Sequence, residues 1–321
     1  MPQIGENLLK ATTLLESDEL VGIPTETVYG LAANALSDTA VIKIFEAKNR
    51  PTFNPLIVHV VDINAINKYA ELDPISLKLA EAFMPGPFTL LLPKKPIISD
   101  LITAGSSKVA IRVPNQIMTT KLLMLLTFPL AAPSANPSGY VSPTTAQHVL
   151  NGLKDKVSYI LDGGPCEVGL ESTIAEVSNN QIVLHRSGAV TAEQMELITG
   201  LKVVLKEEAD KNPASAGQMK SHYATKTPLI RGDIPTLIQQ YEDKNIAVIS
   251  FNTVYEGLKT GHQYVLSPMG DLKEAAKHLF EVMRCIDEFQ FDIIITEIFP
   301  DQGLGRAIND RLGRAQEINK S

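Results

Sequence analysis

Two short polar segments carry residue types that suit the binding of a phosphorylated ligand, and the first of them is "APSANPSG". Here Ser134 and Asn136 stand two apart among prolines. Proline disfavours helical geometry in the residue before it, so the stretch should be extended, and side chains two apart in an extended chain share a side. The sequence predicts a hydroxyl and an amide pointing into one space. A loop whose Ser and Asn satisfy their own backbone is the alternative.

The second segment, "EAKNRPTFNPLIVHV", brings two cations together. Lys48 closes a helical pattern that begins at Asp38, and Pro51 biases Arg50 toward extended geometry. We therefore expect both cations on one side of the chain as it leaves the helix. His59 lies in the apolar strand that follows. A solvated helix end and a satisfied core histidine are the alternatives.

Polar side chains also occur at the ends of other predicted strands. The segment "GIPTETVYGL" displays Thr25, Thr27 and Tyr29 in alternation before an expected glycine turn. In "KVAIRVPN", Arg112 stands inside a β-branched strand, where a charge needs either a structural carboxylate or an anionic ligand. Further polar positions are Ser172 and Thr173 in "LESTI", Arg186 in "VLHRSGAV", and the capping-box pair Thr191 and Gln194. Since ligands of α/β folds bind beyond strand ends, we expect the hydroxyls of Thr25, Thr27 and Tyr29 to face a ligand, with turn capping as the alternative. The capping-box pair is expected to begin a helix.

The chemistry of these segments favours a nucleotide. They are rich in Lys, Arg, Ser, Thr and Asn and nearly empty of candidate bases. Phosphoryl or nucleotidyl transfer needs charge neutralisation and alignment more than covalent catalysis. The sequence has no P-loop, HExxH or GxSxG motif, and "GLGRAIN" at 303–309 carries only part of a dinucleotide fingerprint.

Composition limits the remaining possibilities. The chain has 321 residues, 44% of them hydrophobic, which is enough for two cores. Its 29 Lys and Arg against 36 Asp and Glu give a net charge of −7, which argues against a basic surface that coats nucleic acid. Cys166 and Cys285 lie far apart without metal-ligand spacing, so we expect no metal site and a reducing, cytoplasmic setting. The N-terminus lacks a secretion signal, and the longest apolar run is too short for a membrane span.

The pattern of the first two hundred residues indicates an α/β domain with a mixed sheet. Periodicity predicts helices near 38–48, 74–84, 116–126 and 191–200, and another at the N-terminus over 4–15. Strands are predicted within 20–25, 55–61, 88–93, 108–114, 128–134, 157–164, 172–178 and 181–188.

A second, smaller domain is predicted after a linker. Residues 206–228 are charged, rich in small residues and without periodicity. Beyond them "NIAVIS", "YVLS" and "FDIIITEIF" read as strands and 271–289 as an amphipathic helix, a Rossmann-like β-α-β arrangement. The expected organisation is a catalytic domain over 1–205, a linker over 206–228 and an accessory domain over 229–321.

Taken in order, "PTETVYGL", "KNRP", "NPLIVHV", "MPGPFTLLLP", "VAIRVP", "APSANPSG", "ESTI" and "LHRSGAV" resemble the YrdC-type domain of threonylcarbamoyl-AMP synthases over residues 10–205. "AGQMKSHYATKTP" is similar to the linker of the two-domain form of that family, except that Ala216 and Thr225 stand where prolines are expected. The resemblance implies a twisted mixed YrdC-type sheet followed by the accessory domain.

The same resemblance implies the residues of the site. Those implied for ATP are Lys48, Arg50, Thr52, Ser134, Asn136, Ser142, Arg186 and Tyr223, of which Lys48, Arg50, Ser134 and Asn136 would carry catalysis. Those implied for threonine are Thr25, His59, Arg112, Ala132 and Ser172. Tyr223, in the linker, would fold over the ligands and exclude water.

The implied reaction converts L-threonine, bicarbonate and ATP into threonylcarbamoyl-AMP and pyrophosphate, for the N6-threonylcarbamoyladenosine of tRNA. Mg²⁺ is expected with ATP as the phosphate counterion, and a downstream threonylcarbamoyl transferase that acts on tRNA is the expected partner. One alternative is a module whose main role is to bind double-stranded RNA or tRNA. Weak RNA binding by the enzyme itself is also an expectation. Another is a carbamoyl-transfer domain like that of hydrogenase maturation proteins, whose zinc-finger and acylphosphatase-like segments this chain lacks.

Overall fold

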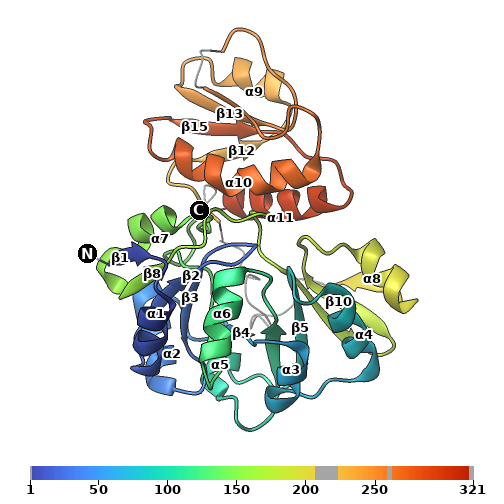
Figure 1. Ribbon diagram of the computed structural model, residues 1–321. Helices are drawn as coiled ribbons and strands as arrows, with labels where there is room; N and C mark the ends of the chain where they lie inside the picture. Colours follow the sequence, from blue (N-terminus) through green and yellow to red (C-terminus); the bar gives the residue numbers. More distant parts are fainter. Residues whose placement is uncertain (1, 207–222, 259–261, 318–321) are drawn as a thin grey trace. The chain divides into compact units, whose positions relative to one another are not determined.

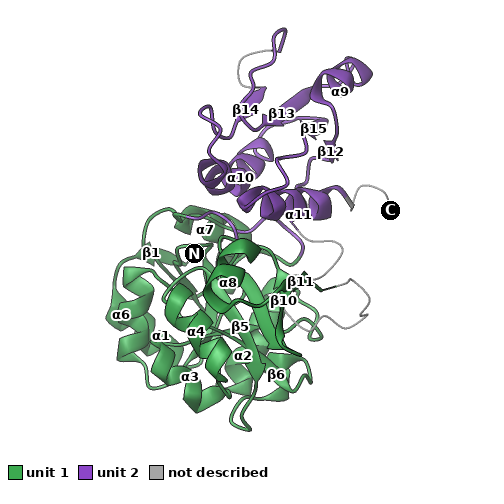
Figure 2. Ribbon diagram, turned by 90° about the vertical axis from the view of Figure 1, so that its right-hand side faces the viewer, with its two compact units in different colours: residues 1–138, 143–167, 171–218 green, residues 139–142, 168–170, 219–321 purple. Residues whose placement is uncertain are grey.

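The chain divides into two compact units, each described here by itself (Figures 1 and 2). The computed structural model describes residues 2–206, 223–258 and 262–317. Unit 1 contains residues 1–138, 143–167 and 171–218, and unit 2 contains residues 139–142, 168–170 and 219–321. The predicted linker, with Ala216, therefore lies mostly outside the described residues.

The helices of unit 1 begin at residues whose side chains cap the first turn. Ser37 caps the helix that ends at Lys48, and Asp73 caps a helix with proline in its first turn. The capping box predicted at Thr191 and Gln194 is confirmed. The helices are α1 (Leu8–Glu16), α2 (Asp38–Lys48), α3 (Ile63–Tyr69), α4 (Pro74–Phe83), α5 (Asp100–Thr103), α6 (Ile117–Leu125), α7 (Ala146–Leu153) and α8 (Ala192–Thr199).

An eleven-stranded mixed sheet forms the centre of unit 1. Its strand order is β1-β8-β2-β3-β7-β4-β6-β5-β9-β10-β11. The sheet contains parallel pairs, such as β4 with β6, and antiparallel pairs, such as β5 with β6. The strands are β1 (Gln3–Gly5), β2 (Val21–Ile23), β3 (Gly30–Asn34), β4 (Ile57–His59), β5 (Phe88–Pro93), β6 (Lys108–Arg112), β7 (Leu130–Ala131), β8 (Tyr159–Leu161), β9 (Thr173–Ser178), β10 (Gln181–Arg186) and β11 (Val203–Leu205). The predicted α/β class is confirmed.

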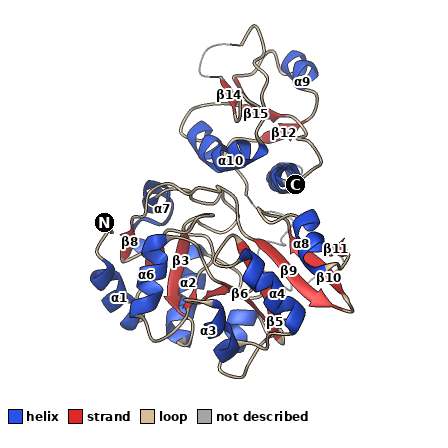
Figure 3. Ribbon diagram, turned by 45° about the vertical axis from the view of Figure 1, so that its right-hand side comes forward, coloured by secondary structure: helices blue, strands red, loops and turns tan. Residues whose placement is uncertain are grey.

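Helices cover both faces of this sheet (Figure 3). Leu31 of β3 packs in one hydrophobic cluster, with residues of α2 and α4, whereas its neighbour Ala32 packs in another, with residues of α1 and α6. Because successive side chains of a strand point to opposite faces, the two clusters are the two sides of one sheet. Both faces are therefore buried, and polar side chains gather at the strand ends.

Two local expectations for unit 1 are wrong. The N-terminal helix begins at Leu8, and Ile4 instead lies in β1, which pairs with β8. The expected turn at Gly30 is the first residue of β3, which pairs with β2 and β7. In both places pairing with a neighbouring strand prevails over the local sequence pattern.

Unit 2 contains a four-stranded parallel sheet in the order β12-β15-β13-β14. Its strands are β12 (Leu229–Arg231), β13 (Ile246–Ser250), β14 (Gln263–Val265) and β15 (Ile293–Thr296), and its helices are α9 (Ile234–Gln240), α10 (Leu272–Ile286) and α11 (Leu304–Glu317). Strand β12 and helices α9 and α11 add to the predicted β-α-β arrangement. No helix in the described part of the chain is long and apolar enough to cross a membrane.

The short segment Gly139–Ser142 belongs to unit 2 by its contacts, although unit 1 contains the residues on either side of it. Arg284 of α10 donates to the carbonyls of Val141 and Ser142 and lies 4.8 Å from the ring centroid of Tyr140. The Tyr140 hydroxyl donates to Asp287 at 2.9 Å. This segment is therefore held by a buried arginine and an aspartate of unit 2.

Candidate functional site

The strand order of unit 1 brings several predicted site residues to one edge of the sheet. His59 and Arg112 are the last residues of the parallel strands β4 and β6 and are paired in register. β5 runs antiparallel to β6, so β5 begins at the edge where β6 ends. In the same way β9, which is parallel to β5, begins where β10 ends. Thr89, Ser172 and Arg186 therefore share the edge with His59 and Arg112.

The turn after β2 adds two threonines. Thr25 Oγ1 accepts hydrogen bonds from the backbone N–H groups of Thr27 and Val28, both at 3.2 Å, and donates to the carbonyl of Val28. Such local bonds explain why a threonine stabilises a turn here. The Thr25 and Thr27 hydroxyls are 2.7 Å apart. Both side chains are buried, and the turn holds them rigidly.

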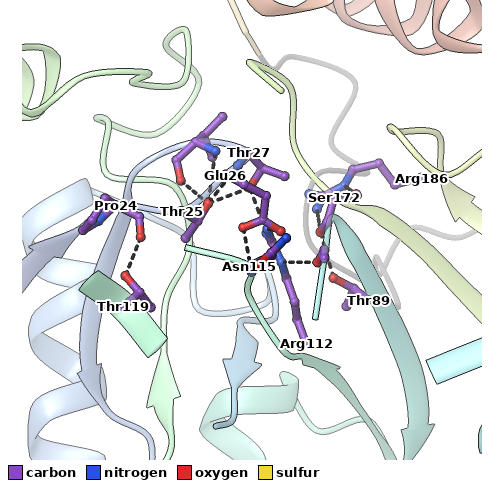
Figure 4. Close-up of polar contacts among 12 residues, drawn as sticks. Pro24, Thr25, Glu26, Thr27, Thr89, Arg112, Asn115, Thr119, Ser172 and Arg186 are labelled. Atoms are coloured by element: carbon purple, nitrogen blue, oxygen red, sulfur yellow. Dashed lines mark hydrogen bonds and ion pairs between the residues drawn. The ribbon is translucent and has the colours of Figure 1, made fainter. Parts of the chain in front are cut away.

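Arg112 is the charged centre of this edge (Figure 4). Its Nη1 donates to Thr27 Oγ1 at 2.8 Å, and its Nε donates to the carbonyl of Gly86 at 3.2 Å. Its Nη2 lies 2.7 Å from Oε1 of Glu26 in an ion pair whose side chains are only 4% and 5% exposed. The sequence left a structural carboxylate or a ligand as partners of Arg112, and the structure supplies Glu26.

His59 lies beside Arg112 as a neutral imidazole. Burial, and then the positive charge of Arg112, lower the pKa of His59 to about 3. Its Nδ1 has no hydrogen-bond partner within the described ranges. His59 is therefore a buried, uncharged polar group. We call Thr25, Glu26, Thr27, His59 and Arg112 the Arg112 cluster.

Ser172 connects residues that the sequence assigned to different ligands. Its hydroxyl shares a 2.7 Å hydrogen bond with Thr89, and Arg186 donates both to this hydroxyl at 3.1 Å and to the carbonyl of Ser172 at 2.9 Å (Figure 4). Ser172 is implied for threonine and Arg186 for the nucleotide. The structure therefore brings a residue of each set into direct contact.

Lys48 and the proline-rich segment also come together, as the sequence predicts. Lys48 is the last residue of α2, and Asn49 ends the helix with a left-handed φ of 50°. Lys48 is 1% exposed, and its ammonium donates to the carbonyls of Ser134 and Asn136. The contact is with the backbone of the segment, so the lysine fixes its path.

Arg50 turns to different carbonyls. Its Nε donates to Asn54 at 3.1 Å and its Nη2 to Pro55 at 2.9 Å. The guanidinium thus braces the loop that leads into β4. We call Lys48, Arg50, Ser134 and Asn136 the Lys48 cluster.

Backbone hydrogen bonds from three neighbours hold the segment that carries Ser134 and Asn136. Ser134 forms an antiparallel bridge with Gly30, and the N–H of Ala135 donates to Tyr29 at 2.8 Å. The N–H of Ala132 donates to Ile57 at 3.0 Å. Extended geometry is confirmed at Leu130–Ala131 and at Ser134, whereas Ala135 and Asn136 lie in a bend. Ala132 takes part through its backbone.

Other predicted residues lie elsewhere. Thr52 is exposed in the loop after α2, and Tyr29 directs its hydroxyl to Gly164 and Asp162 rather than to the threonines. Ser142 is fully buried and groups with unit 2. Tyr223 also groups with unit 2, where its ring stacks on Phe280 at 5.4 Å, so its role over a ligand stays a prediction.

Sequence reasoning missed Glu26 and Thr89. Glu26 stands inside "PTET", between the two threonines that were singled out. Glu26 could have been predicted from Arg112, because a buried arginine requires a carboxylate or another anion nearby. Glu26 is a carboxylate within a segment already predicted to lie at the site.

The fold defines a two-unit α/β protein, with an eleven-stranded mixed sheet in one unit and a four-stranded parallel sheet in the other. A family model described as "Telomere recombination" (Sua5, YciO and YrdC) matches residues 13–188, and one described as "Threonylcarbamoyl-AMP synthase, C-terminal domain" matches residues 190–316. The chain belongs to the two-domain threonylcarbamoyl-AMP synthase family.

Relatives and solved structures agree with this assignment. The threonylcarbamoyl-AMP synthase of Bacillus subtilis is 41% identical over 98% of this chain and 93% of its own length. That of Pyrococcus abyssi is 36% identical over 95% of this chain and 92% of its own. The crystal structure of P. abyssi Sua5 complexed with L-threonine matches with a TM-score of 0.90 and 33% identity, covering 99% of this chain and 98% of that one.

Proposed function

We propose that the protein is an L-threonylcarbamoyladenylate synthase, which converts L-threonine, bicarbonate and ATP into threonylcarbamoyl-AMP and pyrophosphate. The observation that carries the proposal is the Arg112 cluster, a buried set of charges and hydroxyls in a chain whose full-length relatives are named for this reaction. The threonine complex of the P. abyssi protein supports the amino acid as substrate.

The Arg112 cluster would hold threonine. A guanidinium pairs well with a carboxylate, and the hydroxyls of Thr25 and Ser172 and the neutral ring of His59 offer hydrogen bonds to the remaining polar atoms. The N–H of Ala132 bonds to Ile57, the first residue of the strand that ends at His59. The cluster thus recognises a small polar amino acid.

The Lys48 cluster, with Thr52 and Arg186 of the same unit, would hold ATP, and the family resemblance implies Ser142 and Tyr223 for the same ligand. Lys48 is a buried cation, and its positive charge would attract the phosphates of a nucleotide. The amide of Asn136 and the hydroxyl of Ser134 would add hydrogen bonds to the phosphates. These residues would stabilise charge that develops on the phosphates during transfer.

The proposed reaction has two steps. The threonine amine attacks the carbon of bicarbonate, a C–N bond forms and water leaves, which gives a carbamate. A carbamate oxygen then attacks the α-phosphorus of ATP, and the bond from this phosphorus to the bridging oxygen breaks to release pyrophosphate. Positioning of both substrates supplies most of the rate enhancement.

Mg²⁺ would enter with ATP as the counterion of its phosphates. The side chains of the Lys48 cluster are cations, a hydroxyl and an amide, and these suit the phosphate oxygens of a metal–nucleotide complex more than the metal itself. When bound, the ion would neutralise phosphate charge.

The product would pass to a threonylcarbamoyl transferase that acts on tRNA, in the cytoplasm. The two free cysteines, Cys166 and Cys285, are consistent with that compartment. The net charge of −7 supports catalysis over RNA binding as the primary role.

A three-arm assay tests the proposal. Purified protein is incubated with ATP, bicarbonate and L-threonine, then with carbamoyl phosphate in place of bicarbonate and threonine, and finally titrated with tRNA alone. We expect pyrophosphate only in the first arm. Release with carbamoyl phosphate, or tight tRNA binding without any pyrophosphate release, would replace the proposed function by a carbamoyl-transfer or RNA-binding role.

A further inference from the structure

Glu26 and Arg112 form a buried ion pair whose facing atoms retain hydrogen-bonding capacity. Within the described residues, Glu26 Oε1 and Arg112 Nη2 lie 2.7 Å apart, yet neither atom makes a directed hydrogen bond. Buried polar atoms are nearly always hydrogen-bonded, so two such atoms side by side need an explanation. A ligand that bonds to both of them is one.

The rest of the pair is fixed in place. Glu26 Oε2 accepts a hydrogen bond from the backbone N–H of Asn115 at 3.1 Å. Arg112 is held by Gly86 and by Thr27, whose hydroxyl continues through Thr25 to the carbonyl of Val28. A guanidinium has five N–H groups, so these contacts leave some for a ligand. Glu26 Oε1 and Arg112 Nη2 therefore face each other within the ion pair, with hydrogen-bonding capacity left for a ligand.

The charge of the pair selects the kind of ligand that fits. A buried guanidinium and a buried carboxylate sum to zero. A simple anion bound beside them would leave a net negative charge away from water, and a simple cation would leave a net positive one, both at a high cost in free energy. A zwitterion leaves the sum at zero.

We infer that Glu26 recognises the ammonium group of the substrate amino acid while Arg112 binds its carboxylate. On this basis Glu26 is a specificity-determining residue, because a ligand must carry both the carboxylate and the ammonium of an α-amino acid to bind tightly. The neighbouring groups agree, because the hydroxyls of Thr25 and Thr27 and the uncharged His59 add polarity without charge. The inference rests on the proposed function and names the group that each charge of threonine meets.

Three ligands test the inference by calorimetry in the absence of ATP. They are L-threonine, 2,3-dihydroxybutanoate, which lacks the ammonium, and L-threoninamide, which lacks the carboxylate. The wild-type protein should bind threonine about thirtyfold or more tightly than either analogue. In Glu26→Gln, the affinity for threonine should fall by a similar factor. The variant should then bind threonine no more tightly than 2,3-dihydroxybutanoate.

Two further variants separate recognition from a structural role. Glu26→Asp keeps the carboxylate and should keep the preference for threonine over 2,3-dihydroxybutanoate. Glu176→Gln alters another buried, ion-paired carboxylate of unit 1, held by Lys108 and His185, and should change neither ligand's affinity. Circular dichroism confirms that each variant is folded.

The outcomes are distinct. If Glu26→Gln weakens threonine and 2,3-dihydroxybutanoate equally, Glu26 only supports Arg112 and the inference is wrong, while pyrophosphate release by the wild type would leave the proposed function standing. If the wild type shows the expected ligand preference but releases no pyrophosphate, the proposed function fails and the recognition by Glu26 holds.

Discussion

The two polar clusters of unit 1 hold their cations in different ways. In the Arg112 cluster the guanidinium contacts a carboxylate, a hydroxyl and a carbonyl, so side chains supply much of its environment. In the Lys48 cluster, Lys48 and Arg50 donate to backbone carbonyls of the segments around them. The described contacts of the first cluster thus include an opposite charge, and those of the second include main-chain dipoles.

This difference has a functional meaning. A charge-balanced cluster favours a zwitterion, whereas the positive charges of Lys48 and Arg50 would attract the phosphates of a nucleotide. The two clusters would therefore favour ligands of different charge. The following changes would break or sharpen this comparison, from the largest expected effect to the smallest.

Arg112→Met should destabilise unit 1 by about 3–5 kcal/mol, because it leaves the Glu26 carboxylate buried without its ion-pair partner. The free energy of unfolding in urea measures the effect. The double variant Arg112→Met/Glu26→Met should regain most of that stability without regaining threonine binding, since apolar side chains can replace a buried ion pair. A double variant no more stable than the single one would contradict the charge-balance argument.

Lys48→Ala should lower threonine-dependent pyrophosphate release by about a hundredfold or more, the scale of losing one electrostatic contact to a transition state. The affinity for threonine, measured without ATP, should stay within about threefold. Lys43→Ala, on the same helix and paired at the surface with Glu19, is the matched control and should retain activity. Equal losses in both variants would remove Lys48 from the nucleotide site, and Asn136→Ala should behave as Lys48→Ala does.

His59 should make stability fall in acid. Its pKa is about 3 in the folded protein against an ordinary value of 6.5, so below pH 6.5 the unfolded chain binds a proton that the folded one does not. The free energy of unfolding should therefore fall by up to about 1.4 kcal/mol per pH unit from pH 6.5 downward on account of this residue. His59→Gln should flatten the curve by this amount, seen in the difference between the two urea-unfolding profiles. A difference that does not change with pH would show that His59 titrates normally.

Much of the Lys48 cluster could be predicted from the sequence, because neighbouring residues along the chain determine the local geometry of its segments. Helical periodicity and the following proline place Lys48 and Arg50 at a helix end, and prolines keep the segment around Ser134 extended. The need of Arg112 for a partner was equally clear. Which partner it has was not, because Glu26 reaches Arg112 only through the pairing of strands far apart in the sequence.

The elements that were missed have the same origin. Strand β3, "GLAAN", consists of small residues with little intrinsic preference for a strand, and it is formed by its neighbours β2 and β7. In the N-terminal segment, pairing of β1 with β8 overrides a helical spacing that includes Ile4. Local patterns predict where many helices and strands begin and end. The pairing of distant strands decides which side chains come into contact.

The segment Gly139–Ser142 shows that a boundary drawn along the sequence is not a boundary of the fold. A chain that ends after residue 206 would keep these four residues but lose Arg284 and Asp287. Arg284 donates to the carbonyls of Val141 and Ser142, and Asp287 accepts from the Tyr140 hydroxyl. Their buried polar groups would then have to find water or rearrange. Anyone who wishes to study the larger unit alone must therefore redesign this segment or supply the remaining polypeptide in trans.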